Sequence, residues 1–328
     1  MSENAGKISS TGPGPARKRA LLVDMAIRLV KEKPLGTAGA VIVLLMLITG
    51  IFADLLAPYG MNEMTLAHRL AGPSGEHILG ADQIGRDLLS RIIYGARISM
   101  YVGLGASLLN VSVAIAIGTI SGFLGGKTDL VIQRFVDAWM CFPGLVIFLT
   151  VLSITGPGLI QVILVLGISS GISSSRVIRS SVINIKENMY VHAAFALGAS
   201  TPRILVRHIL PNIMAPTIIL FTLAMGGMII AEASLSFLGF GIPPPEPSWG
   251  GMLSGSGRKY MVSAPWMAIW PGLALAIVVY GINMLGDAIR DILDPRLRGG
   301  LGRYSGVKTK GRAKEAQQAA DAGETEQR

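Results

Sequence analysis

Long runs of residues without a charged side chain constrain this sequence most. A bilayer core is about 30 Å thick, and a helix that crosses it needs roughly 20 predominantly apolar residues. Five runs without Asp, Glu, Lys or Arg reach about this length or more: 35–53, 98–126, 138–175, 212–231 and 260–286. The mean hydropathy of +0.54, with 51% hydrophobic and 15% charged residues, is not typical of a soluble protein. The chain is therefore predicted to lie in a membrane.

The run 138–175 is about twice as long as one span requires. It is interrupted by Gly156-Pro157-Gly158, where proline removes a backbone donor and glycine permits a reversal. The run therefore predicts two helices. The first run is long for the apolar part of a signal peptide, and no Ala-x-Ala cleavage site follows it, so it is expected to be retained. The predicted fold class is an all-α integral membrane protein with six transmembrane helices.

Positive charge indicates how these spans are oriented. If the N-terminus is cytoplasmic, six crossings place 1–34, 122–134, 175–211 and the part after 286 in the cytoplasm, and most of the Lys and Arg residues fall there. This is the asymmetry that the positive-inside rule describes. The net charge of +9 then reflects topology and anionic membrane lipid, and no nucleic-acid partner is expected. The polar tails 1–20 and 299–328 are predicted to be disordered cytoplasmic segments.

The cytoplasmic segment 186–211, which we call the 186–211 loop, has a pattern of its own. Residues 186–197 are good helix formers, and Gly198 supplies a left-handed stop. Thr201 is expected to cap a second short helix that Pro211 ends. The face of the first helix is expected to consist of Tyr190, Ala194 and Leu197. Short helices are marginal alone, so tertiary or partner contacts should hold this helix-turn-helix.

The 186–211 loop resembles the cytoplasmic signature loop of ATP-binding-cassette (ABC) importer permeases, which is Glu-Ala-Ala, three residues, Gly, nine residues, Ile-x-Leu-Pro. The positions in register are Ala193, Ala194, Gly198, Leu210 and Pro211. His192 stands where the family usually has Glu, and His208 stands where it has Ile. In the family this helix docks in a groove of the ATPase subunit and transmits ATP-driven motion. The departure at His192 affects one polar contact of that surface.

The resemblance covers about residues 30–298 and favours the C-type subunit of dipeptide, oligopeptide and nickel permeases. The further segments that carry it are 79–91, 93–99, 232–241, 247–250, 285–287 and 290–298. It implies a type I ABC importer transmembrane domain at 97–290. It also implies an N-terminal peptide-permease segment at 21–75 that contains one extra transmembrane helix.

By this resemblance, the chain pairs with a homologous second permease, two ATPase subunits and an extracytoplasmic substrate-binding protein. ATP and Mg would bind the partner subunits, so no cofactor and no catalytic residue are expected here. The implied activity is alternating-access import of di- or oligopeptides across the cytoplasmic membrane of a prokaryote. Nickel or glutathione-type cargo is the alternative within the family. A non-transporting membrane scaffold, or a proton-coupled carrier using Glu232, is the alternative from another class.

Four polar residues within apolar runs are candidates for the translocation pathway. Asp137 follows Arg134 by one helical turn, and a structural pair between them is favoured over a pathway role. For Glu232, pathway lining and a helix-packing contact are left open. Asn110 and Asn283 are expected to form interhelical hydrogen bonds.

Several other patterns do not predict sites. Gly125-Gly126-Lys127-Thr128 resembles the end of a phosphate-binding loop, but Ser121 replaces the required first glycine and no strand precedes it. The four histidines show no metal-ligand spacing, and no nucleophile-and-base arrangement is present. The single cysteine, Cys141, excludes an intrachain disulfide. The sequence therefore favours transport over membrane enzymology.

Overall fold

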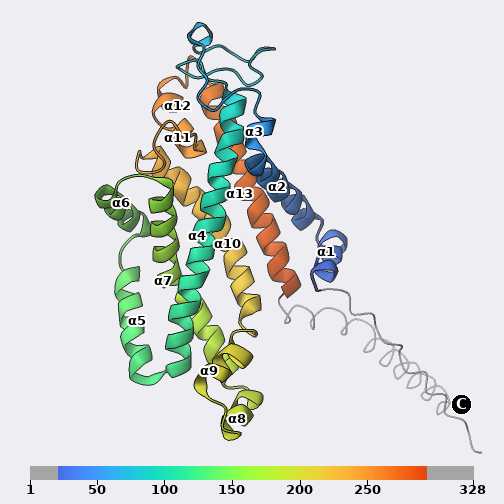
Figure 1. Cartoon of the computed structure of the whole chain (residues 1–328), viewed down its shortest axis with the longest axis vertical. Helices are drawn as coiled ribbons and strands as arrows, with labels where there is room; N and C mark the ends of the chain where they lie inside the picture. Colours follow the sequence, from blue (N-terminus) through green and yellow to red (C-terminus); the bar gives the residue numbers. More distant parts are fainter. Residues whose placement is uncertain (1–20, 294–328) are drawn as a thin grey trace, which may run out of the picture.

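The computed structural model describes residues 21–293, which form helices joined by turns and loops (Figure 1). Both tails predicted to be disordered lie outside these residues. In chain order the elements are α1 (Leu21–Glu32), α2 (Pro34–Ile51), α3 (Ala53–Leu56), η1 (Leu66–His68), α4 (Leu88–Leu124), α5 (Gly126–Met140), α6 (Gly144–Thr155), α7 (Leu159–Lys186), α8 (Met189–Ala196), α9 (Thr201–Ile204), η2 (Leu205–Ile209), α10 (Met214–Phe237), α11 (Trp249–Leu253), α12 (Gly255–Lys259) and α13 (Trp266–Leu293).

Five of these helices are long and apolar enough to cross a membrane, namely α2, α4, α7, α10 and α13. The shorter α5 and α6 meet the same criterion only together, and they are bent by 85° at the break between them. The six predicted spans are thus present when the bent pair counts as one span. The predicted break at Gly156-Pro157-Gly158 is also confirmed, because α6 ends just before it and α7 begins just after it.

Spanning helices continue past the ends of their uncharged runs, and α4 and α7 do so by the most residues. The predicted second span starts at 98, but α4 begins at Leu88 and includes Arg97, which donates to the Gly50 carbonyl at 2.9 Å and to Asp54 at 2.7 Å. This guanidinium also holds the pKa of the Asp54 carboxyl below its ordinary value. The predicted fourth span stops at 175, but α7 continues to Lys186. Charged residues continue these helices because other segments of the chain supply their partners.

The start of the third span is also displaced. The sequence predicts a cytoplasmic loop over 122–134, but α5 already begins at Gly126 and runs back beside α4 and α7 (Figure 1). Its first turn is held by Asp129, which accepts hydrogen bonds from Arg179 on α7, with a shortest N–O distance of 2.5 Å. Asp137 therefore lies near the end of a helix rather than at the start of a span.

Helices α4 and α7 pack side by side over much of their length (Figure 1). Two glycines make this close approach possible. A Cβ atom at Gly118 would lie 2.6 Å from the Ser175 carbonyl oxygen, and one at Gly171 would lie 2.6 Å from the Cβ of Val113. Small residues at such contacts are the usual means of packing helices in membranes. On the other side of α4, α10 contacts both α4 and α13, and α2 packs against α13.

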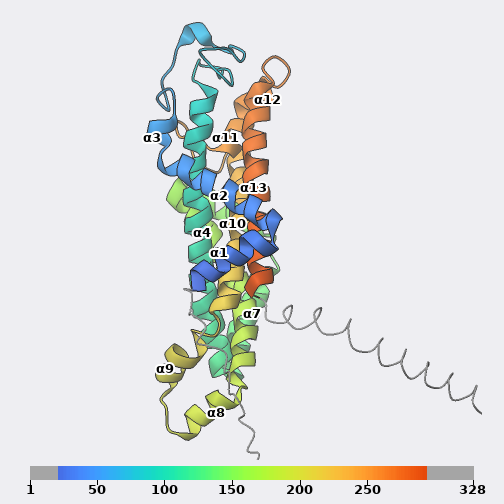
Figure 2. The ribbon, with the colours of Figure 1, turned by 90° about the vertical axis from the view of Figure 1, so that its right-hand side faces the viewer.

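The bundle has two structurally different ends (Figures 1 and 2). The end that carries the 57–87 segment, α11 and α12 is called the α12 end, and the opposite end is called the α8–α9 end. At the α12 end, Trp249 is 2% exposed and donates to the Ile92 carbonyl at 3.1 Å, which fixes α11 against α4. The two ends contain the features relevant to function.

Candidate functional site

The 186–211 loop forms the α8–α9 end and is anchored by apolar side chains. Val191 of α8, Ile204 of α9 and Ile209 of η2 are fully buried. They belong to one cluster with Phe123 at the end of α4 and with Ile178 and Val182 on α7. This burial stabilises the short helices, as the sequence predicts for elements that are marginal alone.

Gly198 ends α8 as predicted, in the left-handed region with a φ of 77°. Its N–H donates to the Phe195 carbonyl, and the Ala199 N–H donates to the Ala194 carbonyl, each at 3.0 Å. This pair of bonds is a Schellman motif, which satisfies the last carbonyls of the helix. The chain then turns back toward the bundle through α9.

The structure adds detail to three local predictions for this loop. Tyr190 and Leu197, which are expected on one face with Ala194, are 44% and 89% exposed, and the fully buried position of α8 is Val191. Ser200 rather than Thr201 occupies the N-cap position of α9, and its side chain makes no capping bond. Pro211 does not stop a regular helix, because α9 passes into the π-helical turn η2 first. A helix this short is placed by its buried anchors rather than by its own periodicity.

The remaining predicted positions of the loop are at its surface. His192 and Ala193 are exposed, and the His192 Nε2 atom lies 4.0 Å from the Glu187 Oε2 atom. Leu210 is partly buried against the anchoring cluster, and Pro211 is exposed. His192 thus faces outward, where a partner could contact it.

Three large apolar side chains of this loop are mostly exposed to solvent. Met189 is 85% exposed, Leu197 is 89% exposed and Val206 is 64% exposed. We call these three residues the bare apolar set. Met189 begins α8, Leu197 follows its end and Val206 lies on η2, and several large exposed apolar side chains in one short segment are typical of an interaction surface. A partner subunit that covers them would remove this area from water.

The four polar pathway candidates lie on four different helices, α4, α5, α10 and α13. Asp137 on α5 is 41% exposed and pairs with Arg176 of α7 as well as with Arg134, the latter at 3.3 Å. The predicted pair with Arg134 is therefore confirmed, and the bond to α7 is an addition. Asn283 on α13 is exposed, and its Oδ1 atom faces Gly226 on α10.

The other two candidates are buried. Asn110 on α4 is 1% exposed, and neither side-chain atom hydrogen-bonds to a described residue, so the interhelical hydrogen bond predicted for it is not formed within the described part of the chain. Glu232 on α10 is also 1% exposed, and its Oε1 atom accepts a hydrogen bond from Ser236 at 2.6 Å. Its second oxygen has no partner within the described part of the chain.

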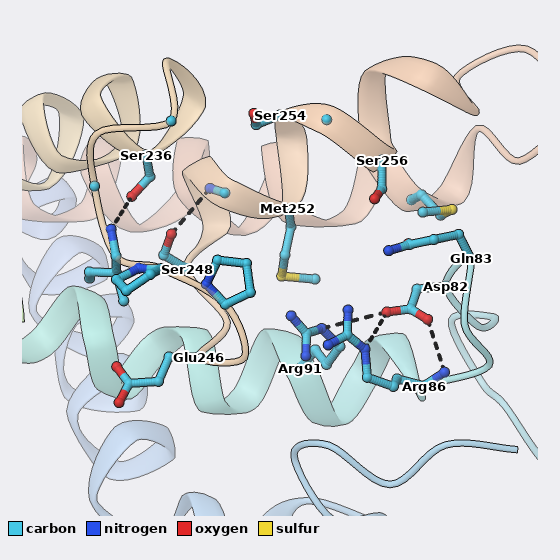
Figure 3. Close-up of a pocket in the computed structure, with 18 of the residues that line it drawn as sticks. Asp82, Gln83, Arg86, Arg91, Ser236, Glu246, Ser248, Met252, Ser254 and Ser256 are labelled. Carbon is cyan, nitrogen blue, oxygen red and sulfur yellow. Dashed lines mark hydrogen bonds and ion pairs between the residues drawn. The ribbon is translucent and has the colours of Figure 1, made fainter. Parts of the chain in front are cut away.

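A cavity of about 350 Å³ with both polar and apolar lining residues lies at the α12 end (Figure 3). It is built from the start of α4, the 82–86 segment before it, the loop after α10, and α11 with α12. Asp82 is 4% exposed and Arg91 is 6% exposed. Figure 3 shows the side chains of Arg86 and Arg91 both directed at the same oxygen of the Asp82 carboxylate.

The sequence analysis missed these three residues as a site, although they lie in a segment that carries the family resemblance. The available signal was the density of charged residues between 82 and 91, directly before an apolar helix. A neighbouring network holds the start of α4. Asp87 accepts bonds from the Ser90 N–H and hydroxyl, each at 2.8 Å, and its other oxygen lies 2.9 Å from the His77 Nδ1 atom. Asp87 is therefore the N-cap of α4.

Two known protein families match parts of this chain. Residues 114–299 match the family described as "Binding-protein-dependent transport system inner membrane component". Residues 22–73 match the family described as "N-terminal TM domain of oligopeptide transport permease C". The second match covers α1 to α3 and the first part of the 57–87 segment.

Curated relatives align over most of the chain. It is 38% identical over 273 residues to the dipeptide transport system permease protein DppC of Alkalihalophilus pseudofirmus, covering 83% of this chain and 90% of the relative. It is 36% identical to the oligopeptide transport system permease protein OppC of Bacillus subtilis, covering 85% and 91%. It is 38% identical to the glutathione transport system permease protein GsiD of Pectobacterium atrosepticum, covering 80% and 87%.

Among solved structures, the chain is similar to one of the MetNI methionine ABC transporter in an inward facing conformation. The TM-score is 0.51 at 16% identity, and the alignment covers 62% of this chain and 96% of the other. This likeness shows the fold, which is that of an ABC importer transmembrane domain. Permease subunits of this family are non-catalytic and carry no cofactor. The chain belongs to the binding-protein-dependent transport permeases: it is a C-type, multi-pass inner-membrane subunit of an ABC importer, a system that works with ATPase and binding-protein partners.

Proposed function

We propose that this chain imports di- or oligopeptides across the cytoplasmic membrane by alternating access. It forms one half of the pathway, and a homologous second permease forms the other half. Two ATPase subunits bind at the α8–α9 end, and an extracytoplasmic binding protein delivers the cargo at the α12 end. Both termini are cytoplasmic in this arrangement, because it places most Lys and Arg residues inside and leaves lipid around the apolar helices.

The observation that carries the coupling role is the contrast within the 186–211 loop. Its anchors Val191, Ile204 and Ile209 are fully buried, so the loop moves with the ends of α4 and α7. The bare apolar set projects from the same short helices. A helix laid in a hydrophobic groove of an ATPase subunit would cover these side chains and transmit its motion to the bundle.

The pathway is proposed to pass along α5 and α7. The Asp137–Arg176 pair joins α5 to the spanning helix α7, and both side chains are 41% exposed. Charged groups within the membrane are stable only where they contact protein or water. The side of α5 and α7 that carries this pair is therefore expected to contact the second permease. Asn110 and Glu232 are buried between helices, which favours a packing role for them. Asn283 is exposed and lies on the opposite side of α10.

Peptide cargo is proposed because two of the relatives are dipeptide and oligopeptide permeases. Glutathione is the second candidate, because a relative of equal identity is described as a glutathione permease. Glutathione is itself a tripeptide, so both candidates share charged ends and a peptide backbone.

The test is ATP-dependent uptake of labelled Ala-Phe by the complete complex in proteoliposomes, with glutathione and nickel as parallel cargoes. Replacing both Met189 and Leu197 by Ser should abolish most uptake while the complex still contains folded permease. The matched control is Val262→Ser, which removes an equally bare apolar side chain, 99% exposed, beyond α12. Uptake of nickel alone would contradict peptide cargo. No uptake of any cargo by a well-assembled complex would contradict transport and support a scaffold.

A further inference from the structure

The cavity at the α12 end contains more positive than negative charge on its inner wall. Arg86 and Arg91 share one carboxylate, that of Asp82, whose Oδ2 atom lies 2.6 Å from the Nε of Arg86 and 3.9 Å from the Nε of Arg91. The other oxygen of Asp82 is occupied by the backbone N–H groups of Ile84 and Arg86. One carboxylate therefore serves two guanidinium groups, both of which are about nine-tenths buried or more.

Most donors of these two arginines are unused. A guanidinium has five N–H donors. Within the described residues, Arg86 donates from its side chain only to Asp82, and Arg91 donates only to the Met61 carbonyl at 3.3 Å. Both arginines line the cavity, so their remaining N–H groups are available to a ligand, and the guanidinium fork fits the geometry of a carboxylate. The inner wall is thus complementary to an anionic group.

The same cavity has an acidic residue away from the arginines. Glu246, in the proline-rich loop after α10, lines the cavity and is exposed. It forms no ion pair with any described residue, and Figure 3 shows it apart from Arg86 and Arg91. The lining of the cavity also includes the apolar side chains of Leu88, Ile242 and Met252. Opposite charges in a cavity with part of its lining apolar match a zwitterion with an apolar middle.

We propose that this cavity is a peptide-binding site on the permease itself, which recognises both charged ends of the cargo. The terminal carboxylate binds Arg86 and Arg91, and the terminal ammonium binds near Glu246. A volume of about 350 Å³ is at the small end of ligand pockets and suits a short peptide. The site rests on the proposed peptide cargo and adds a selection step after release from the binding protein.

The experiment compares three labelled cargoes in the reconstituted complex: Ala-Phe, its C-terminal amide and its N-acetyl form. The binding protein is the same in every reaction, so its own preference cancels when variants are compared with wild type. Arg86→Gln should lower the ratio of acid to amide uptake by about tenfold, as expected for the loss of a charge-assisted hydrogen bond. Arg86→Lys should restore part of this ratio, because it keeps the charge and loses the fork.

Glu246→Gln should instead lower the ratio of free-amine to N-acetyl uptake and leave the acid-to-amide ratio unchanged. The control is Arg69→Gln, which removes an exposed arginine of the same outer segment that does not line the cavity. Assembly of each complex is checked by co-purification with the partner subunits.

Two results would overturn the site. In the first, Arg86→Gln lowers acid and amide uptake equally, which would mean that Arg86 holds the fold or a side chain of the binding protein. In the second, neither ratio changes in a complex that imports Ala-Phe normally. Both results leave peptide cargo intact. Failure of the wild-type complex to import Ala-Phe would instead overturn the proposed cargo, and this site with it.

Discussion

The two ends of the bundle are stabilised by different kinds of buried side chain. At the α12 end, charged and polar side chains such as Asp87, His77 and Ser90 are buried and bonded to one another. At the α8–α9 end, the buried side chains are apolar, and the bare apolar set remains uncovered. The first end is held by a network of buried polar side chains, whereas the second is held by buried apolar side chains.

Removal of Asp87 should have the largest effect on stability. Asp87→Ala leaves the buried His77 ring and the start of α4 without their acceptor, and should cost about 3 kcal/mol of unfolding free energy. Thermal unfolding of the purified permease measures the loss. Asp54→Ala removes an exposed carboxylate paired with Arg97 and should change the unfolding temperature far less. Equal effects of the two variants would contradict the view that the α12 end is held by its buried network.

Ile204→Ala tests the anchoring of the α8–α9 end. This fully buried side chain should leave a cavity beneath α9 and cost about 2 kcal/mol or more locally. The expected result is faster proteolysis of the 186–211 loop, together with loss of coupling between ATP hydrolysis and uptake. Val206→Ala, at a neighbouring position that is 64% exposed, should leave proteolysis unchanged. If the 186–211 loop of Ile204→Ala resisted proteolysis as well as that of the wild type, Ile204 would not be an anchor of the loop.

Gly198→Ala should have a smaller effect on the same loop. The φ of 77° places any Cβ atom in an unfavourable left-handed conformation, which costs about 1 kcal/mol. Amide hydrogen exchange in α8 should increase. The comparison is Gly227→Ala in α10, where φ is ordinary and a Cβ atom would meet nothing within 4 Å. If both glycines tolerated alanine equally well, the stop signal at Gly198 would have no energetic role.

His192→Glu should have the smallest effect. The new carboxylate would stand near the exposed Glu187, and like charges at such a surface position cost less than about 0.5 kcal/mol. Stability should therefore remain within error, and ATPase activity in the complex should remain within about twofold. His192→Gln is the uncharged control. A large gain in coupling with Glu alone would show that this position makes a specific polar contact with the ATPase.

Local pattern predicted the features that depend on a few neighbouring residues. The number of spans followed from apolar run length, because a bilayer sets how many apolar residues a helix needs. The break at Gly156-Pro157-Gly158 and the stop at Gly198 followed from backbone chemistry alone. The ends of α4 and α7 were predicted too short, because a run without charges ends at Arg97 or Arg176 whether or not a partner exists elsewhere.

The sequence by itself determined that this chain spans a membrane and carries a short helix-turn-helix between its fourth and fifth spans. Only the tertiary structure decided which side chains meet. Asp137 pairs with Arg176, which is 39 positions away in the sequence. Val191 rather than Tyr190 anchors α8, and Asp82 pairs with two arginines at a cavity. The physical reason is that transfer free energy and backbone preference act locally, whereas partners for buried charge are supplied by helices that are distant in the chain.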